Sequence, residues 1–182
     1  MSNIVYIATS LDSYIADRDG KLEWLNAVPN PEKSDFGYAD FMDGIDALVM
    51  GRITFETVCG FDIEWPYSKP VFVLSRTLRS IPDGYGDKAE IISGSLQTVL
   101  TTLHEQSFNN LYIDGGKTIQ SFLAEDLIDE LIITRIPILL GGGTPLFGKL
   151  PNHLEFEHLN TEIFNNSMVQ DHYRRKVHAI NS

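Results

Sequence analysis

The segment LYIDGGKTIQSFL, residues 111–123, constrains the fold of this 182-residue chain more than any other. Its first three residues are apolar, as in a short buried strand. Asp114, Gly115 and Gly116 break the strand, and apolar residues with helical spacing follow. Such a junction can bind an anion, because glycines let backbone N–H groups approach a phosphate and a helix N-terminus favours negative charge. A tight turn with no ligand is the alternative.

Two other apolar runs end in similar polar turns. Residues 47–50 lead into a glycine turn and a helix, and residues 70–74 lead into hydroxyl residues and an arginine. Open α/β sheets bind ligands beyond the carboxyl ends of their strands, so one elongated ligand, such as a dinucleotide, can meet all three junctions. The predicted contacts are Gly51, Arg52, Thr54, Ser75, Arg76, Thr77, Gly115, Gly116, Lys117 and Thr118.

The cations in these turns refine the prediction. Arg76 lies between two hydroxyl residues and suits a ribose 2′-phosphate, which selects NADPH over NADH. Arg52 has an alternative role in a surface salt bridge with Glu56, four residues on. Residues 116–118 match the end of a phosphate-binding P-loop, but that motif needs a glycine at position 111, where this chain has leucine. A P-loop NTPase is therefore excluded.

The rest of the chain predicts one α/β domain over residues 1–178 and a disordered tail at 179–182. Apolar runs and helical spacing predict strands at 4–8, 89–92 and 130–136, and helices at 96–105 and from about Ser34 to Gly44. Residues 154–163 and 167–177 predict an antiparallel hairpin joined by Phe164-Asn165-Asn166. Three glycines at 141–143 precede a proline turn, which favours a special loop conformation over a phosphate grip.

Composition excludes several classes of protein. The formal net charge of -11 argues against a nucleic-acid partner, which lysine and arginine clusters would bind. The single cysteine, Cys59, allows no intramolecular disulfide and fits a cytoplasmic protein. We find no signal peptide and no apolar run of membrane-spanning length, so no membrane partner is expected. No metal is expected either, because His and Cys lack metal-ligand spacing.

The motifs and their order resemble a known family. Residues 49–56 (VMGRITFE) look like a segment of dihydrofolate reductase, and residues 73–76 look like its next strand and cofactor turn. Residues 112–117 (YIDGGK) look like the glycine-rich pyrophosphate turn of the same enzyme. The match is closer to the RibD C-terminal domain family, whose signatures are similar to residues 10–12 (SLD), 114–116 (DGG), 127–131 (LIDEL) and 140–147 (LGGGTPLF). The resemblance implies a dihydrofolate reductase-like three-layer α/β/α fold, with a mostly parallel central sheet and a C-terminal antiparallel hairpin. It also implies NADPH as hydride donor and a homodimer.

The implied activity resembles that of 5-amino-6-(5-phosphoribosylamino)uracil reductase of riboflavin biosynthesis. Two positions depart from that pattern: Tyr6 replaces a lysine, and Ser13 replaces a glycine after Ser10-Leu11-Asp12. The deaminase motifs that often precede this domain are absent from the sequence. A dihydrofolate or pteridine reductase-like enzyme, a non-catalytic NADP-binding protein and a structural protein without a nucleotide therefore remain alternatives.

Reduction of a C=N or C=O bond needs a proton as well as a hydride. Asp12, just past the first strand, and Asp35, which matches an acidic residue of pterin-reducing enzymes by ungapped counting, are the predicted catalytic residues. Asp12 has an alternative role in capping its own turn, and Asp35 in a solvated helix face. A flat heterocyclic substrate is expected between the loop 12–14, the helix 36–41 and the loop around Trp65.

Overall fold

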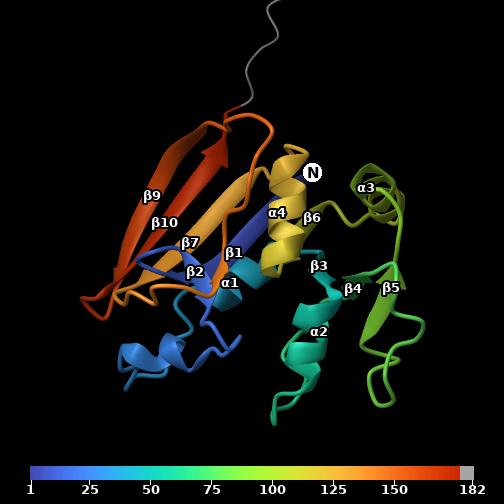
Figure 1. Cartoon of the computed structure of the whole chain (residues 1–182). Helices are drawn as coiled ribbons and strands as arrows, with labels where there is room; N and C mark the ends of the chain where they lie inside the picture. The colour runs from blue at the N-terminus through green and yellow to red at the C-terminus, as the bar shows by residue number, and fades with distance from the viewer. Residues whose placement is uncertain (177–182) are drawn as a thin grey trace, which may run out of the picture.

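The computed structural model describes residues 1–176, and one large twisted sheet runs through it (Figure 1). Eight strands lie in the order β5-β4-β3-β6-β1-β7-β10-β9, and β2 pairs with β8 separately. The strands are β1 (Ser2–Ser10), β2 (Tyr14–Ala16), β3 (Ala47–Gly51), β4 (Val71–Leu74), β5 (Ala89–Ile92), β6 (Asn110–Asp114), β7 (Glu130–Ile136), β8 (Thr144–Pro145), β9 (Phe156–Phe164) and β10 (Met168–Arg175). The helices are η1 (Glu23–Ala27), α1 (Tyr38–Asp43), α2 (Arg52–Cys59), α3 (Leu96–Glu105) and α4 (Gly116–Ala124).

The strand directions confirm the predicted mostly parallel sheet with an antiparallel C-terminal hairpin. Neighbouring strands from β5 through β7 pair in parallel, whereas β10 is antiparallel to both β7 and β9. Figure 1 shows the hairpin at one edge of the sheet and β5 at the other. A parallel strand needs a crossover connection, and the predicted strand–helix alternation supplies it.

Helices cover both faces of the sheet because its central strands are apolar on both sides. In β3, Val49 packs with the cluster that contains α3 and α4, whereas Leu48 and Met50 pack with the cluster that contains α1 and α2. In β6, Ile113 and Tyr112 divide in the same way. Successive side chains of a strand point to opposite faces, so these two strands tie both helical layers to the middle of the sheet.

Helix α1 begins later than the sequence predicts. Phe36 and Gly37 have φ values of 55° and 84°, in the left-handed region, so the helix starts only at Tyr38. The carboxylate of Asp35 accepts hydrogen bonds from the N–H groups of Gly37 (3.1 Å) and Ala39 (2.9 Å). Asp35 therefore holds the turn before the helix from a position outside it.

The hairpin turn follows the sequence prediction closely. The N–H of Ser167 donates a 3.0 Å hydrogen bond to the carbonyl of Phe164, and the two residues between them, Asn165 and Asn166, have φ values of 50° and 51°. Two successive positive φ values define the tight hairpin turn that asparagine tolerates best. The predicted tail at 179–182, and the end of the second predicted hairpin strand at residue 177, lie outside the described residues.

The loop that contains Gly141, Gly142 and Gly143 has the special conformation expected of it. All three glycines have positive φ, and a Cβ at Gly143 would overlap the carbonyl oxygen of Ala16. The guanidinium of Arg18 donates a 2.7 Å hydrogen bond to the carbonyl of Gly141. The glycines therefore let this loop pack closely against the segment after β2.

Candidate functional site

The three predicted junctions meet at the carboxyl ends of three inner strands. Because β4, β3 and β6 are adjacent and parallel, these ends lie side by side. A cavity of about 750 Å³ opens there, and all ten residues predicted to contact a dinucleotide line it. The structure thus gathers residues from 51 to 118 around a single space.

Close glycine contacts join the starts of α2 and α4 beside this cavity. A Cβ at Gly115 would overlap the hydroxyl of Thr54, and a Cβ at Gly51 would lie 2.7 Å from the hydroxyl of Thr118. A Cβ at Gly116 would lie 2.6 Å from Cδ1 of Ile15. The two helix N-termini can approach each other only because Gly51 and Gly115 lack side chains, and Gly116 makes room for Ile15 of β2 in the same way. Helix N-termini offer backbone N–H donors and a favourable dipole to an anion.

Three cationic side chains line the same cavity. Lys117 and Arg76 are exposed, and Arg52 donates a 3.0 Å hydrogen bond to Glu56, four residues further along α2. The salt bridge that was the alternative role of Arg52 therefore forms in this structure. Both of its side chains are half exposed, so the pair contributes little to stability and leaves the guanidinium within reach of a stronger anion.

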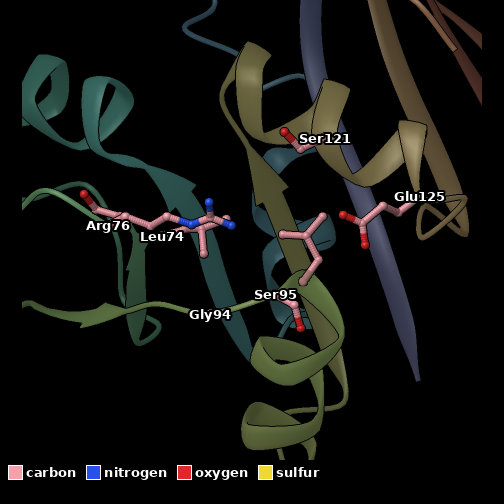
Figure 2. Close-up of a pocket in the computed structure, with 8 residues that line it drawn as sticks. Leu74, Arg76, Gly94, Ser95, Ser121 and Glu125 are labelled. Carbon is pink, nitrogen blue, oxygen red and sulfur yellow. The ribbon is translucent and has the colours of Figure 1, made fainter.

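A smaller cavity of about 440 Å³ adjoins the first beyond β4. Its lining includes Leu74 and Arg76, the turn residues Gly94 and Ser95, and Ser121 and Glu125 around the end of α4 (Figure 2). Leu74, Ser75, Arg76 and Ser121 line both cavities, so the two spaces lie next to each other beside Arg76. A long ligand can therefore extend from the glycine turns past this arginine.

The large cavity has a second, apolar side, which we call the apolar wall. Its members are Ile7 and Ala8 of β1, Leu22 and Leu25 in and beside η1, Val58 of α2, and Phe61. Tyr67 lines this region as well and packs against Trp65 with ring centroids 5.2 Å apart. Of the three segments predicted to surround the substrate, the loop around Trp65 contributes Phe61 and Tyr67 to the lining, whereas residues 12–14, residues 36–41 and Trp65 itself are absent from it.

Asp114, the last residue of β6, also lines the cavity. Its Oδ1 accepts a 2.8 Å hydrogen bond from the N–H of Gly115. Burial raises the pKa of this carboxyl to about 6, although the hydrogen bond from Gly115 lowers it. A carboxyl group with such a pKa carries a proton in a useful fraction of molecules near neutral pH, as a general acid requires.

The described residues form neither a metal-binding cluster nor a membrane-spanning helix. Within residues 1–176, no group of three or more His, Cys, Asp or Glu side chains is arranged to hold a metal ion. None of the helices in that range combines the length and hydropathy that a membrane span requires.

Comparison with known proteins gives the family. The model of the RibD C-terminal domain matches residues 3–170. The chain belongs to the RibD C-terminal domain family. It is 36% identical over 175 residues to the uncharacterized protein YwjB of Bacillus subtilis, covering 94% of this chain and 97% of that protein.

Solved structures agree with this membership. A putative riboflavin biosynthesis protein from Shewanella sp. PV-4 is 55% identical, with a TM-score of 0.95 over 97% of this chain and 100% of that one. A dihydrofolate reductase from Enterococcus faecalis, complexed with NADP(H) and RAB-propyl, is only 16% identical but has a TM-score of 0.65 over 97% of both chains. The fold is therefore that of the RibD C-terminal domain and of dihydrofolate reductase, as predicted.

The two departures from the riboflavin-enzyme pattern have visible structural consequences. The Tyr6 hydroxyl donates to the carbonyl of Phe36 (2.8 Å) and accepts from the amide of Gln170 (3.1 Å), so it is held within the fold. Ser13 has a φ of 65°, a conformation that glycine adopts without cost and serine adopts with strain. Position 13 thus keeps a glycine-like backbone in this RibD C-terminal domain although its residue has changed.

The structure does not place Asp12 or Asp35 on the lining of the cavity. Asp12 accepts hydrogen bonds from the Ser10 hydroxyl (2.6 Å) and from the N–H groups of Leu140 (3.1 Å) and Gly141 (2.7 Å). The Ser10 hydrogen bond is the main reason that the pKa of Asp12 lies below its usual range. The hydrogen bonds from Ala39 and Gly37 lower the pKa of Asp35 in the same way. Both carboxylates are better suited to bracing loops than to donating protons.

The sequence predicts Asp114 only as part of an anion-binding turn, whereas the structure makes it a candidate proton donor. One observation pointed to it: a lone carboxylate follows three buried residues and directly precedes the paired glycines. That position puts the side chain at the carboxyl end of a central strand, where ligands bind. Its raised pKa depends on burial by distant segments, which the local sequence does not show.

Proposed function

We propose that the protein is an NADPH-dependent reductase of a small heterocyclic substrate. The observation that supports this most strongly is the convergence of all ten predicted cofactor residues on one cavity. Membership of the RibD C-terminal domain family and likeness to reductases support oxidoreductase chemistry. The cofactor and the substrate are our inferences from the cavity.

The residues that line the cavity support NADPH as the cofactor. The starts of α2 and α4, with Arg52 and Lys117, would hold the pyrophosphate. Arg76, Ser75 and Thr77 would hold the 2′-phosphate, and the adjoining 440 Å³ cavity would receive the adenine end. Glu125 also lines that smaller cavity and would repel a phosphate placed close to it. Arg76 is the cation of the same lining, so it would decide whether the 2′-phosphate of NADPH is accepted there.

NADPH, when bound, supplies the hydride, and the protein supplies orientation and a proton. Asp114 is the group best placed for the second task, because it lines the cavity and has a pKa of about 6. In our proposal its carboxyl gives a proton to the nitrogen or oxygen of the bond being reduced. Solvent then protonates the carboxylate again, so the acid is restored for the next cycle.

A non-catalytic NADP-binding protein is the rival that the departures at Tyr6 and Ser13 favour. The two functions differ in turnover and share cofactor binding. In the first experiment, the melting temperature of the purified protein is recorded with NADPH and with NADH. A rise with NADPH is expected, and no rise with either cofactor would contradict both functions.

In the second experiment, loss of NADPH absorbance is followed in the presence of pyrimidine and pteridine substrates. We expect oxidation of NADPH with at least one of them. Tight NADPH binding without turnover on any member of the panel would favour the non-catalytic function instead.

A further inference from the structure

We infer that the substrate is a planar nitrogen heterocycle without a phosphate group, neutral or cationic when bound. This inference rests on the proposed reductase function and narrows its substrate class. It differs from the phosphorylated substrate that the family resemblance implies. The distribution of charged and apolar residues around the large cavity supports this substrate class.

Positive charge is confined to one side of the cavity. Among the described residues that line it, the cationic side chains are Arg52, Arg76 and Lys117. All three belong to the junctions assigned to the cofactor phosphates. Val58 on the apolar wall lies six positions after Arg52, which is about 9 Å along a helix. Arg52 is also paired with Glu56.

The apolar side of the cavity offers a phosphate no cation, and the hydroxyl of Tyr67 is a neutral donor there. The apolar wall presents only hydrocarbon and aromatic surface. Thr57 lines the cavity nearby, but its hydroxyl already donates to the carbonyl of Ile53 at 2.8 Å. A phosphate buried there would lose its hydration without gaining a cationic partner, which is strongly unfavourable. Tyr6, at the position where the riboflavin enzymes have lysine, is held by Phe36 and Gln170.

The acidic group of the cavity adds a repulsive contribution. Asp114 is the one carboxylate among the described lining residues, and it lies one residue before the Gly115 turn. Above its pKa of about 6 it would repel a phosphate dianion. The same carboxylate would accept hydrogen bonds from ring N–H or amino groups, and such bonds are strong because the acceptor is charged. Charge and shape together therefore select a flat ring with N–H donors.

The test compares matched pairs of ligands that differ only in a phosphate. One pair is a ribosylaminopyrimidine and its 5′-phosphate, and the other is a hydroxymethylpterin and its phosphate ester. Each ligand is titrated calorimetrically into protein saturated with NADP+, which prevents turnover. We expect the unphosphorylated member of at least one pair to bind about tenfold or more tightly than its partner. Equal or tighter binding of the phosphorylated members, or no binding of any of the four, overturns the inference.

A charge introduced at the wall provides an independent check. Phe61 is 41% exposed, so Phe61→Lys should leave the fold intact while placing a cation beside the apolar wall. We expect this variant to lose most of the preference against phosphate, and the matched control Phe61→Leu to keep it. An unchanged preference in Phe61→Lys would show that charge does not set the selectivity.

The proposed function and this inference fail in different ways. If NADPH does not bind, the reductase assignment itself is wrong. If NADPH binds and is oxidised with the phosphorylated ligands in preference, the reductase assignment stands and only the substrate class is wrong.

Discussion

A Cβ on Gly115 would overlap the hydroxyl of Thr54, so these two residues set how closely α2 and α4 approach. Gly115 also has a φ of 89°, which disfavours any other residue. We therefore predict that Gly115→Ala destabilises the protein by roughly 2–4 kcal/mol, combining backbone strain with a steric clash. It should also abolish the NADPH-induced rise in melting temperature. Urea denaturation and thermal shift measure the two effects.

Gly84 provides the matched control for that prediction. Its φ is 87°, almost the same as that of Gly115, but a Cβ there would have no neighbour within 4 Å. Gly84→Ala should therefore cost only the backbone strain, about 1–2 kcal/mol, and should leave NADPH binding unchanged. Adding Thr54→Ala to Gly115→Ala removes the clashing hydroxyl and should restore part of the lost stability. Equal costs at positions 84 and 115 would contradict the packing argument.

Arg76 should determine the choice between the two nicotinamide cofactors. A hydrogen bond to a charged group contributes about 1.5–3 kcal/mol, so Arg76→Ala should weaken NADPH binding roughly 10–100-fold. NADH binding should change much less, because NADH lacks the 2′-phosphate. Fluorescence titration with each cofactor gives both dissociation constants. Arg79→Ala removes a nearby cation that is not part of the cavity lining and serves as the control. Equal weakening of both cofactors by Arg76→Ala would mean that the 2′-phosphate lies elsewhere.

The three carboxylates considered as proton donors can be separated by kinetics. We predict that Asp114→Asn lowers kcat by about 10²–10⁴-fold, the usual contribution of a general acid. Asp12→Asn and Asp35→Asn should leave kcat within about threefold of the wild type, since both residues hold backbone N–H groups outside the cavity. The wild-type kcat should fall as pH rises through about 6, where Asp114 loses its proton. A large loss in Asp12→Asn with no loss in Asp114→Asn would reverse the assignment.

Asp114 should also make folding stability depend on pH. Its folded-state pKa is raised from 3.8 to about 6, so the folded protein holds this proton more tightly than the unfolded chain does. The resulting stabilisation is complete below pH 3.8 and is lost as pH rises through about 6. Relative to wild type, Asp114→Asn should therefore be about 1–3 kcal/mol more favourable at pH 8 than at pH 4. Urea denaturation of both proteins at the two pH values measures this difference.

Asp46→Asn is the control of opposite sign for the pH experiment. Hydrogen bonds from the N–H groups of Asn110 and Asn109 lower the pKa of Asp46, so its ionised form stabilises the folded state. That contribution is present above the pKa of the unfolded chain and is lost as pH falls. The substitution should therefore cost more stability at pH 8 than at low pH. The same pH trend in both variants would indicate a general charge effect.

The sequence predicted those features that depend on neighbouring residues. The bounds of β5, β7 and α3 match the predicted ranges, because apolar spacing and flanking turns define them locally. The paired asparagines between β9 and β10 fix the hairpin in the same way. All ten predicted cofactor residues reach one cavity, since parallel strands bring their carboxyl ends to one edge whatever their separation in the chain.

What the sequence did not reveal depends on distant partners. Asp12 is held by Leu140 and Gly141, which follow it by more than 120 residues. Burial raises the pKa of Asp114, and burial followed by the charge of Asp114 raises the pKa values of Tyr38 and Tyr67, which belong to two separate segments. Helix α1 starts late because two residues before it adopt a left-handed backbone. None of these effects follows from spacing or composition.

The end of β6 assigns neighbouring residues to separate tasks. Asp114 lines the cavity, whereas Gly115 lets the starts of α2 and α4 approach each other and Gly116 makes room for Ile15. A lineage could therefore acquire a new substrate by exchanging one residue at position 114 and a few along the apolar wall, with the cofactor machinery untouched. In such a lineage, the paired glycines would be inherited unchanged, whereas the residue before them would differ with each new substrate.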